Sequence, residues 1–424
     1  MLQNLFNKKQ KRIYLDNAGA TEIGERAKRA LLEALATYGN PSGIHKEGAE
    51  ASVLLDKARA MCATEINAHA YEVYFVSSGT ESCNLAILGT YFSFSKNVKL
   101  KTENSPLPHI ITSSIEHPAI LEPIKSLEKE GKISVTYLPV YEDGIVKVRD
   151  VREALRAETI LVSVMYANNE IGTIQPVKEI GRAIDEWKKE NEKSFTEYPY
   201  FHTDACQAAN YCNLDVLRLK CHLMTVNSSK CYGPKGSALL YKREGISLDP
   251  VTYGGGQERT LRSGTENVSS AYAFGIALKE SQEMRENESA RLRALRDDVV
   301  KDLKIAIPEI IFYGAFDEYS KLPATAYKLH AEKRLPNNIN CRVPGISSEE
   351  MILRLDAKGI AVSHKSACAS METDGSYVLQ AIGTTEDEAK ENIRISMGRS
   401  TESNDMKILV AAMKEISEKY KVMN

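Results

Sequence analysis

Apolar and polar positions alternate with two different periods along residues 50–245. Short, nearly continuous apolar runs are separated by longer stretches in which apolar residues recur every three or four positions. The short runs predict buried strands, and the longer stretches predict amphipathic helices. The predicted strands are 73–76, 109–112, 133–138, 160–165, 200–203, 223–226 and 238–241. The predicted helices include 50–66, 82–91, 119–130 and 177–190.

This alternation is typical of an α/β fold with a mostly parallel sheet, here of seven strands, covered by helices on both faces. Such sheets bind ligands at the carboxyl ends of their strands. The pattern changes after the glycine run at 254–256, where a long helix is predicted over about 268–303. Shorter strands and helices then lead to a charged C-terminal helix that ends near Lys421. The second half therefore predicts a smaller α+β domain packed on the first.

Composition places the chain among ordinary globular proteins. Its 424 residues are 43% hydrophobic and 26% charged, with a net charge of −2. The near-neutral charge argues against a broad nucleic-acid or membrane surface, and no apolar stretch is long enough to span a bilayer. The eight cysteines include no Cys-x-x-Cys pair, so neither a metal site nor a disulfide framework is expected. With no signal-peptide pattern at the start, we expect a cytoplasmic protein.

Lys230 stands between the strand predicted at 223–226 and the Gly233-Pro234 turn. This position directs one amine into a cleft at the end of a strand. A lysine held in this way can form a Schiff base with an aldehyde cofactor. A surface lysine before a loop is the common alternative, so the surrounding residues must decide between them.

Asp204 ends the strand predicted at 200–203. A single aspartate there is more often a helix cap or a turn former. Together with Lys230, however, it matches a pyridoxal phosphate site. This cofactor needs a carboxylate opposite its ring nitrogen, because a protonated pyridinium withdraws electrons better than a neutral pyridine.

Nine short motifs, in this order, resemble those of the class V aminotransferase family and of the cysteine desulfurases within it. They are 14–21, 38–42 with His45, 77–84, 113–117, 168–172, 254–259, 262–265, 366–368 and 393–399. The resemblance implies a fold type I pyridoxal phosphate-dependent transferase. Residues 17–267 would form the large cofactor-binding domain, and residues 1–16 with 268–424 the small α+β domain.

Gly79 and Thr80 lie at a predicted strand-to-helix junction, which offers a phosphate backbone N–H groups, a hydroxyl and the positive end of a helix. A simple N-cap by Thr80 or Ser78 is the alternative reading, and both can hold together. The resemblance adds Asn227 and Ser229 as cofactor contacts. Desulfurases usually carry histidine at the position of Ser229, and we expect cofactor binding to survive this departure.

The resemblance assigns roles to further residues around the ring. His117 would lie over the pyridine and exchange protons with the substrate, although an isolated histidine is more often structural. Gln207 would bond the ring hydroxyl, and Asn168 would lie near that hydroxyl and the substrate carboxylate. Thr265 would reach the phosphate from the neighbouring subunit, which implies a homodimer with shared active sites.

Arg394, flanked by Ile393 and Ile395, matches the α-carboxylate of an amino acid through a bidentate pair. An ordinary strand-edge arginine paired with a local acid is equally compatible with the sequence alone. Asn40, in the second motif, is also expected at the substrate by resemblance.

Cys368 distinguishes a desulfurase from its relatives. It follows a short predicted strand, in a segment of small residues, and its neighbours His364 and Lys365 could lower its pKa. A buried, unreactive cysteine is the alternative. Desulfurases commonly carry small residues where His364 and Lys365 stand, so these two are a second departure.

The resemblance implies an enzyme that converts L-cysteine to L-alanine and leaves the sulfur on Cys368 as a persulfide. A sulfur-acceptor protein would then receive it for iron–sulfur cluster assembly or tRNA thiolation. A selenocysteine lyase and another class V enzyme that does not use Cys368 remain open. A non-catalytic sulfur carrier or scaffold, for which Ser229 is the only hint, is the third alternative.

Overall fold

The computed structural model describes residues 12–97, 106–194, 197–315, 333–364 and 375–423. Its largest unit is a seven-stranded sheet with the strand order β2-β8-β7-β6-β5-β3-β4. The strands are β2 (Val73–Val76), β3 (His109–Ser113), β4 (Ser134–Leu138), β5 (Thr159–Ser163), β6 (Tyr200–Asp204), β7 (Leu223–Asn227) and β8 (Ala238–Lys242). β8 runs antiparallel to both of its neighbours, β2 and β7, and the other strands all run in one direction. The predicted mostly parallel sheet of seven strands is confirmed.

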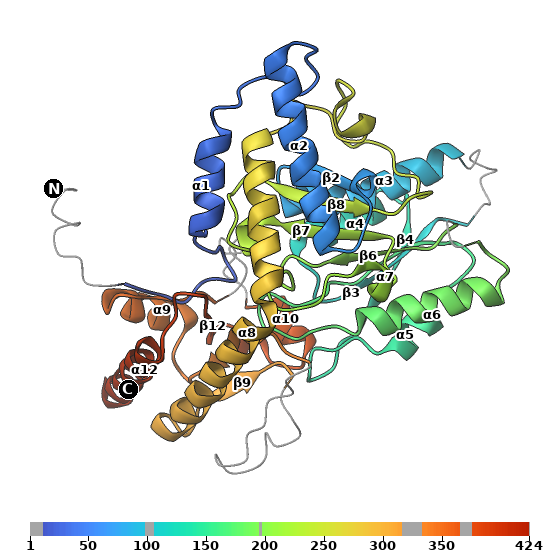
Figure 1. Ribbon diagram of the computed structural model, residues 1–424. Helices are drawn as coiled ribbons and strands as arrows, with labels where there is room; N and C mark the ends of the chain where they lie inside the picture. Colours follow the sequence, from blue (N-terminus) through green and yellow to red (C-terminus); the bar gives the residue numbers. More distant parts are fainter. Residues whose placement is uncertain (1–11, 98–105, 195–196, 316–332, 365–374, 424) are drawn as a thin grey trace.

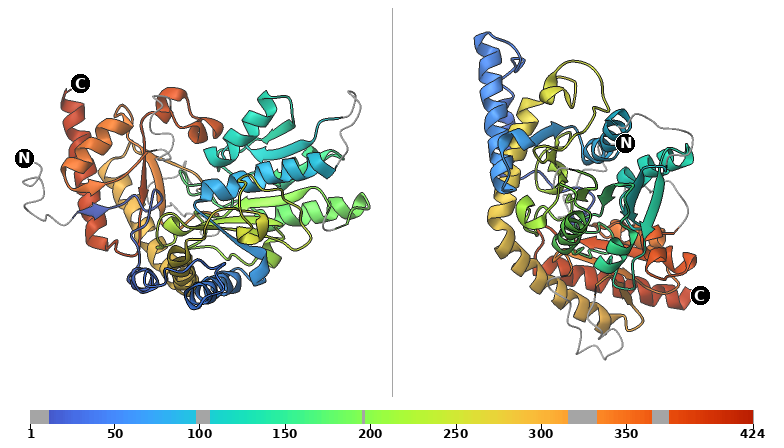
Figure 2. Two further views of the ribbon diagram at one scale, coloured as in Figure 1. Left: turned by 90° about the horizontal axis from the view of Figure 1, so that it is seen from above. Right: turned by 90° about the vertical axis from the view of Figure 1, so that its right-hand side faces the viewer.

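Helices cover both faces of the sheet, which buries its strands from two sides (Figures 1 and 2). Along β5, Leu161 packs with the helices α3 (Gly79–Asn97) and α4 (Pro118–Lys129), whereas Val162 packs with α2 (Lys46–Glu65) and α6 (Val177–Glu190). All five residues of β5 are buried. Because both faces are covered, the strands are continuously apolar rather than alternating.

A smaller unit contains a three-stranded antiparallel sheet, β12 (Asn392–Ser396), β10 (Asn338–Arg342) and β9 (Ile311–Tyr313), in that order. The helices α9 (Ser348–Ala357) and α12 (Ser403–Met423) pack beside it. Near the N-terminus, β1 (Ile13–Tyr14) pairs in parallel with β11 (Ile360–Ala361). Ile13 and Leu15 are therefore buried in the core of this C-terminal unit.

The long helix α8 (Val268–Ala306) belongs to both units. Phe274 and Leu278, near its start, pack in the core of the large sheet, whereas Leu292 and Leu303 pack in the core of the smaller unit. A domain boundary at residue 267 remains a prediction, since the helix that follows it spans both cores.

Shorter elements complete the described part of the chain. They are α1 (Glu25–Ala34), α5 (Val148–Ala154), α7 (Val216–Leu219), α10 (Tyr377–Ala381), α11 (Glu386–Ala389) and the 3-10 turns η2 (Ala70–Glu72), η3 (Ser228–Lys230) and η4 (Gln257–Thr260). Both α1 and α2 pack against α8 (Figure 1). Within the described residues, each helix is too short or too polar to cross a bilayer.

Candidate active site

A cavity of about 160 Å³ lies at the carboxyl ends of the parallel strands of the large sheet. It is lined by Ala18, Gly19, Gly79, Thr80, His117, Ala119, Met165, Ala167, Asn169, Asp204, Cys206, Gln207, Asn227, Lys230 and Arg394. All of these residues except Ala18, Gly19 and Arg394 stand at the carboxyl ends of β2, β3, β5, β6 and β7 or in the segments that follow them. The strand order therefore brings together residues that are far apart in the sequence.

Lys230 ends the 3-10 turn η3, directly after β7. The side chain of Asn227 starts this turn by accepting a hydrogen bond from the backbone N–H of Ser229, at 3.1 Å. The Lys230 Nζ donates to the carbonyl of Ala18 at 2.9 Å and to that of Gly19. The lysine amine thus points into the cavity, against the loop that follows β1.

Asp204 is the last residue of β6, and its carboxylate is fixed by its neighbours. Oδ1 accepts from the backbone N–H of Cys206 at 2.9 Å, and the Cys83 thiol donates to Oδ2 at 3.8 Å. Gln207, one turn further on, donates from Nε2 to the carbonyl of Ala18 at 2.9 Å. Asp204 and Gln207 therefore face the same cavity as Lys230.

Gly79 and Thr80 form the start of α3, as predicted. Ser78, rather than Thr80, caps this helix, because its hydroxyl accepts from the backbone N–H of Glu81 at 3.1 Å. A Cβ on Gly79 would lie 3.1 Å from the Cys206 sulfur, so a side chain there would be crowded. Gly79 and Thr80 line the cavity, so the helix start is a narrow cradle of the kind that binds anions through its backbone N–H groups.

His117 caps α4 and has one ring nitrogen engaged. Its Nδ1 accepts a hydrogen bond from the backbone N–H of Ala119 at 3.1 Å. A neutral ring in this contact carries its proton on Nε2. Burial lowers the pKa of His117; the Asp204 carboxylate opposes this effect and the Lys230 charge adds to it. The imidazole is therefore neutral at pH 7, and its Nε2–H makes no hydrogen bond to the described residues.

Of the two consecutive asparagines, Asn169 lines the cavity and Asn168 does not. The Asn168 side chain is fully buried and forms hydrogen bonds with backbone groups. Its amide donates to the carbonyl of Ile115 at 3.1 Å, and its Oδ1 accepts from Glu170 and Ile171. The predicted role of Asn168 at the ligand is not supported by this geometry, because its polar atoms are already used.

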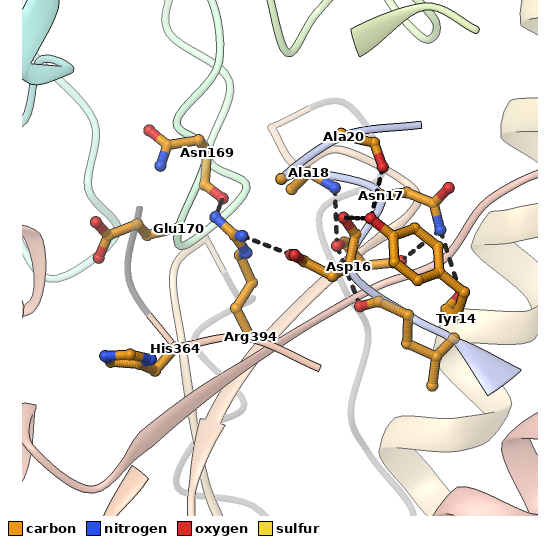
Figure 3. Close-up of polar contacts among 12 residues, drawn as sticks. Tyr14, Asp16, Asn17, Ala18, Ala20, Asn169, Glu170, His364 and Arg394 are labelled. Atoms are coloured by element: carbon orange, nitrogen blue, oxygen red, sulfur yellow. Dashed lines mark hydrogen bonds and ion pairs between the residues drawn. The ribbon is translucent and has the colours of Figure 1, made fainter. Parts of the chain in front are cut away.

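Arg394 lies on β12, and its side chain is only 1% exposed. Nη1 donates to the carbonyl of Asn169 at 3.1 Å, and Nη2 donates to Asp16 Oδ1 at 2.7 Å (Figure 3). Its Nε is buried and has no hydrogen-bond partner among the described residues. The guanidinium therefore lines the cavity with an unused donor, at a position where it can pair with a carboxylate.

Comparison with known proteins agrees with this geometry. The family described as aminotransferase class-V matches residues 13–409. The chain belongs to the class V aminotransferase family. It is 38% identical over 98% of its length to the cysteine desulfurase IscS of Methanosarcina thermophila, of which it covers 94%.

Solved structures give the same assignment. A NifS-like protein superposes with a TM-score of 0.81 at 30% identity, covering 97% of this chain and all of that one. SspA in complex with cysteine superposes with a TM-score of 0.71 at 29% identity, covering 91% of this chain and 98% of the other. Class V aminotransferases are pyridoxal phosphate-dependent enzymes of fold type I, which confirms the predicted fold class.

The residues around the cavity fit this cofactor. An amine at Lys230, a carboxylate at Asp204 and a crowded helix start at Gly79 face one space. These are the groups that an aldehyde, a pyridine nitrogen and a phosphate require. The predicted residues Thr80, His117, Gln207 and Asn227 lie in the same lining.

Besides Asn168, three predicted residues of this class V protein lie outside the cavity. Asn40 and Thr265 are exposed. Ser229 is half-buried, and its hydroxyl donates to Asn227 Oδ1 at 3.2 Å. Ser229 is thus connected to the cavity through Asn227, which lines it.

Cys368 and Lys365 lie outside the described residues, but both flanks of their segment are described. Before it, Ser363 exchanges two backbone hydrogen bonds with Arg394, at 3.1 and 2.6 Å. After it, the hydroxyl of Ser376 donates to Glu170 Oε2 at 2.5 Å, and that of Tyr377 donates to the carbonyl of Glu116 at 2.6 Å. The two flanks are thus fixed next to Arg394, Asn169 and His117.

Some residues of the site were not predicted. Asp16, Ala18 and Gly19 stand in the first motif, which was assigned no chemistry, and Cys206 was not singled out. The motif itself was the available signal, since an Asp-Asn-Ala-Gly sequence after a short strand is typical of a tight loop. Its contacts with Lys230 and Arg394 depend on tertiary structure.

Proposed function

We propose that this protein is a cysteine desulfurase, which converts L-cysteine to L-alanine and transfers the sulfur to Cys368 as a persulfide. The observation that carries the proposal is the meeting of Lys230, Asp204, His117 and Arg394 around one cavity. This arrangement occurs in a chain that is 38% identical to a protein named cysteine desulfurase.

Pyridoxal phosphate would be held by five side chains and one helix start. Lys230 binds its aldehyde, Asp204 pairs with its ring nitrogen, and Gln207 bonds its ring hydroxyl. The start of α3 at Thr80 and the Asn227 amide hold the phosphate, and His117 lies against the ring. When bound, the cofactor supplies an electron sink for negative charge at the substrate Cα.

Arg394 binds the substrate's α-carboxylate. Its Nε is a buried donor without a partner in the described structure, and a carboxylate oxygen would satisfy it. Asn169, next to it in the lining, offers an amide to the same carboxylate or to the ring hydroxyl. We assign to Asn169 the role that the sequence motif suggested for Asn168.

Two side chains move protons. Lys230, with its amine free, would remove the Cα proton at Nζ. His117 holds a proton at Nε2 and delivers it inside the cavity, since its Nδ1 is engaged by Ala119. Its lowered pKa keeps the imidazole uncharged, so it does not repel the nearby ammonium of Lys230.

Cys368 takes up the sulfur. Its thiolate attacks the substrate sulfur; a sulfur–sulfur bond forms, the Cβ–sulfur bond breaks, and its electron pair stays on the carbon product, which becomes L-alanine after protonation. The thiolate and cysteine thus give a persulfide and alanine without any external oxidant. Support comes from the fixed flanks of its segment beside Arg394 and His117.

We further propose a homodimer. Thr265 and Asn40 are exposed outside the protomer's own cavity, as expected if they complete the site of a second copy. Large apolar side chains are exposed on α1, on the loop that follows it and on α2. They are Leu32, Leu35, Tyr38, Ile44 and Val53. A second copy of the chain would cover them and keep them from water.

The persulfide would pass to a sulfur-acceptor protein that serves iron–sulfur cluster assembly or tRNA thiolation. A cytoplasmic location is part of the same proposal. It is supported by the seven described cysteines, all of them free thiols, which persist in a reducing compartment.

The central experiment compares three purified proteins: the wild type, Cys368→Ala and Lys230→Ala. The wild type is expected to be yellow and to form alanine and sulfide from L-cysteine with a thiol reductant. Cys368→Ala should keep the cofactor absorbance but lose sulfide formation, and Lys230→Ala should lose the colour. Full activity of Cys368→Ala on L-cysteine would exclude the proposed sulfur transfer.

Selenocysteine is assayed beside cysteine with the same three proteins. A selenocysteine lyase that does not use Cys368 would keep its rate on selenocysteine in Cys368→Ala. Cys341→Ala is the matched control, because Cys341 is buried on β10 and lies outside the cavity. It is expected to leave both activities unchanged.

A further inference from the structure

The carboxylate of Asp16 holds the guanidinium that lines the cavity. Asp16 follows β1 and is attached to the strand of Arg394 through the backbone: Ser396 donates to the carbonyl of Leu15 at 2.7 Å, and Asn17 donates to that of Ser396 at 3.2 Å. Its Oδ1 accepts from Arg394 Nη2 at 2.7 Å. The Arg394 side chain is 1% exposed and that of Asp16 26%, so the ion pair is mostly shielded from water.

The loop after Asp16 is built around this carboxylate (Figure 3). The hydroxyl of Tyr14 donates to the carbonyls of Asp16, at 3.0 Å, and of Ala20, at 2.8 Å, which closes the loop. A Cβ on Gly19 would collide with the Asp16 carboxylate. Because glycine has no Cβ, Gly19 leaves room for the Asp16 carboxylate.

The Arg394 guanidinium has more N–H donors than its two hydrogen bonds use. A guanidinium has five N–H groups. One bonds Asp16 Oδ1, one bonds the carbonyl of Asn169, and Nε has no partner in the described structure. Three N–H groups therefore remain beside these two hydrogen bonds, enough for a substrate carboxylate to bind while Asp16 stays in place.

We propose that Asp16 is a positioning residue for the substrate's α-carboxylate: it fixes the Arg394 guanidinium so that the remaining N–H groups face the cavity. The inference rests on the proposed role of Arg394. Asp16 also pairs a buried positive charge in the absence of substrate, which would otherwise be unpaired. Without Asp16, the guanidinium would keep its charge but lose its fixed orientation.

The test uses two ligands that differ only in the carboxylate. L-alanine carries it, and ethylamine lacks it, so the ratio of their affinities isolates the contact with Arg394. Binding of each is titrated through the absorbance of the cofactor-loaded protein. In Asp16→Ala, the affinity for L-alanine should fall at least about tenfold, as expected for the loss of an oriented charged hydrogen bond. The affinity for ethylamine should stay within about twofold, since it does not use this contact.

Two further variants separate position from charge. Asp16→Asn keeps an acceptor oxygen at the same place and should bind L-alanine within about threefold of the wild type. Asp16→Glu keeps the buried Arg394 charge paired, so this variant should fold. Its side chain is one methylene longer and therefore displaces the guanidinium. The affinity for L-alanine should fall, and the affinity for ethylamine should not. Glu391→Gln, which removes a carboxylate from Arg342 on the adjacent strand β10, is the matched control.

Wild-type L-alanine affinity in Asp16→Glu and Asp16→Ala would overturn the proposal. Equal losses of L-alanine and ethylamine would also overturn it, because they would show a purely structural role. If the wild type binds L-alanine far better than ethylamine but forms no sulfide from L-cysteine, the desulfurase assignment fails and the role of Asp16 stands. If the wild type does not distinguish the two ligands, the role of Asp16 fails.

Discussion

Glu116 is a fully buried carboxyl beside the candidate catalytic His117. Its Oε1 accepts from the hydroxyl of Ser113 at 2.5 Å and from the N–H of Met165 at 2.8 Å. Its Oε2 is buried without a partner in the described structure. Burial raises the pKa of Glu116 to about 8, and the negative charge of Asp204 adds to the effect. At pH 7 this side chain is therefore mainly a neutral acid that joins β3, β5 and His117.

We expect Glu116 to make the free energy of unfolding depend on pH. The pKa of Glu116 is higher in the folded protein than in the unfolded chain. Its contribution to the free energy of unfolding is therefore complete below pH 4.5 and is lost as the pH rises through about 8. Compared with Glu116→Gln, the wild type should lose stability with a slope of at most about 1.4 kcal/mol per pH unit. Urea unfolding of both proteins over this range measures the difference. Parallel pH profiles would contradict the prediction.

Lys230 and Asp204 could be predicted from the apolar strands that they follow, whereas the role of His117 came from the resemblance to the family. The structure places these three residues together. Asn168 and Asn169 could not be told apart, since adjacent positions match the motif equally and only the local backbone decides which one faces the ligand. Asp16 was missed because its partner is 378 residues away.

At the scale of elements, the turn η4 carries three consecutive residues in the left-handed region. Glu258, Arg259 and Thr260 have φ values of 42°, 54° and 66°, and none is glycine. Each costs on the order of 1–3 kcal/mol. Arg59 on α2 offsets this strain through a buried bidentate pair with Glu258, at 2.7 and 2.8 Å, and Glu258 also accepts from the N–H of Phe75 at 3.0 Å. The pair thus fixes the loop that leads to Thr265.

Breaking this pair should destabilise the protein strongly. Glu258→Gln leaves the Arg59 charge buried and unpaired, and we expect the free energy of unfolding to fall by about 3–5 kcal/mol. The control is Glu186→Gln, which removes one partner of the exposed Arg152–Glu186 pair and should cost less than about 1 kcal/mol. Chemical denaturation of both variants gives the values. Similar costs for the two would show that η4 does not depend on Arg59.

The predictability of an element depended on which residues form its buried face. All seven strands of the large sheet and the helices α2, α3, α4 and α6 were predicted. Isoleucine, leucine and valine mark the buried positions of α4 and α6, whereas α2 is buried mainly through alanines, with Leu55 among them. The helix α1 was not predicted. Its buried residues are Ala27, Ala30 and Ala34, and its leucines at 32 and 35 are exposed, so its apolar pattern points away from the core.

For the whole molecule, the side that carries α1 and α2 differs from the rest of the surface. Leu35 is 61% exposed and Tyr38 82%. Side chains of this size are seldom left in water in such a group unless a partner covers them. The sequence could not show this surface, because an exposed leucine and a buried one look alike until the helix is placed.

Charged substitutions on this surface should separate the subunits. Leu35→Asp is expected to shift the protein from dimer to monomer, measured by sedimentation velocity. It should also weaken cofactor binding, since Thr265 of the second copy would be lost. Leu217→Asp, at an exposed leucine on α7, is the control and should remain a dimer. A dimer of unchanged stability in Leu35→Asp would place the interface elsewhere.

The ion pair between Asp16 and Arg394 also bears on how the protein is made. Ribosomes add residues at about 5–20 per second, so Asp16 emerges on the order of tens of seconds before its partner. β6, which ends at Asp204, and β7, which precedes Lys230, can pair within that time, since both come before β12 in the chain. In a nascent chain, Asp204 and Lys230 can therefore be in place before the Asp16–Arg394 pair has formed. The Asp16–Arg394 pair can form only after β12 has been made.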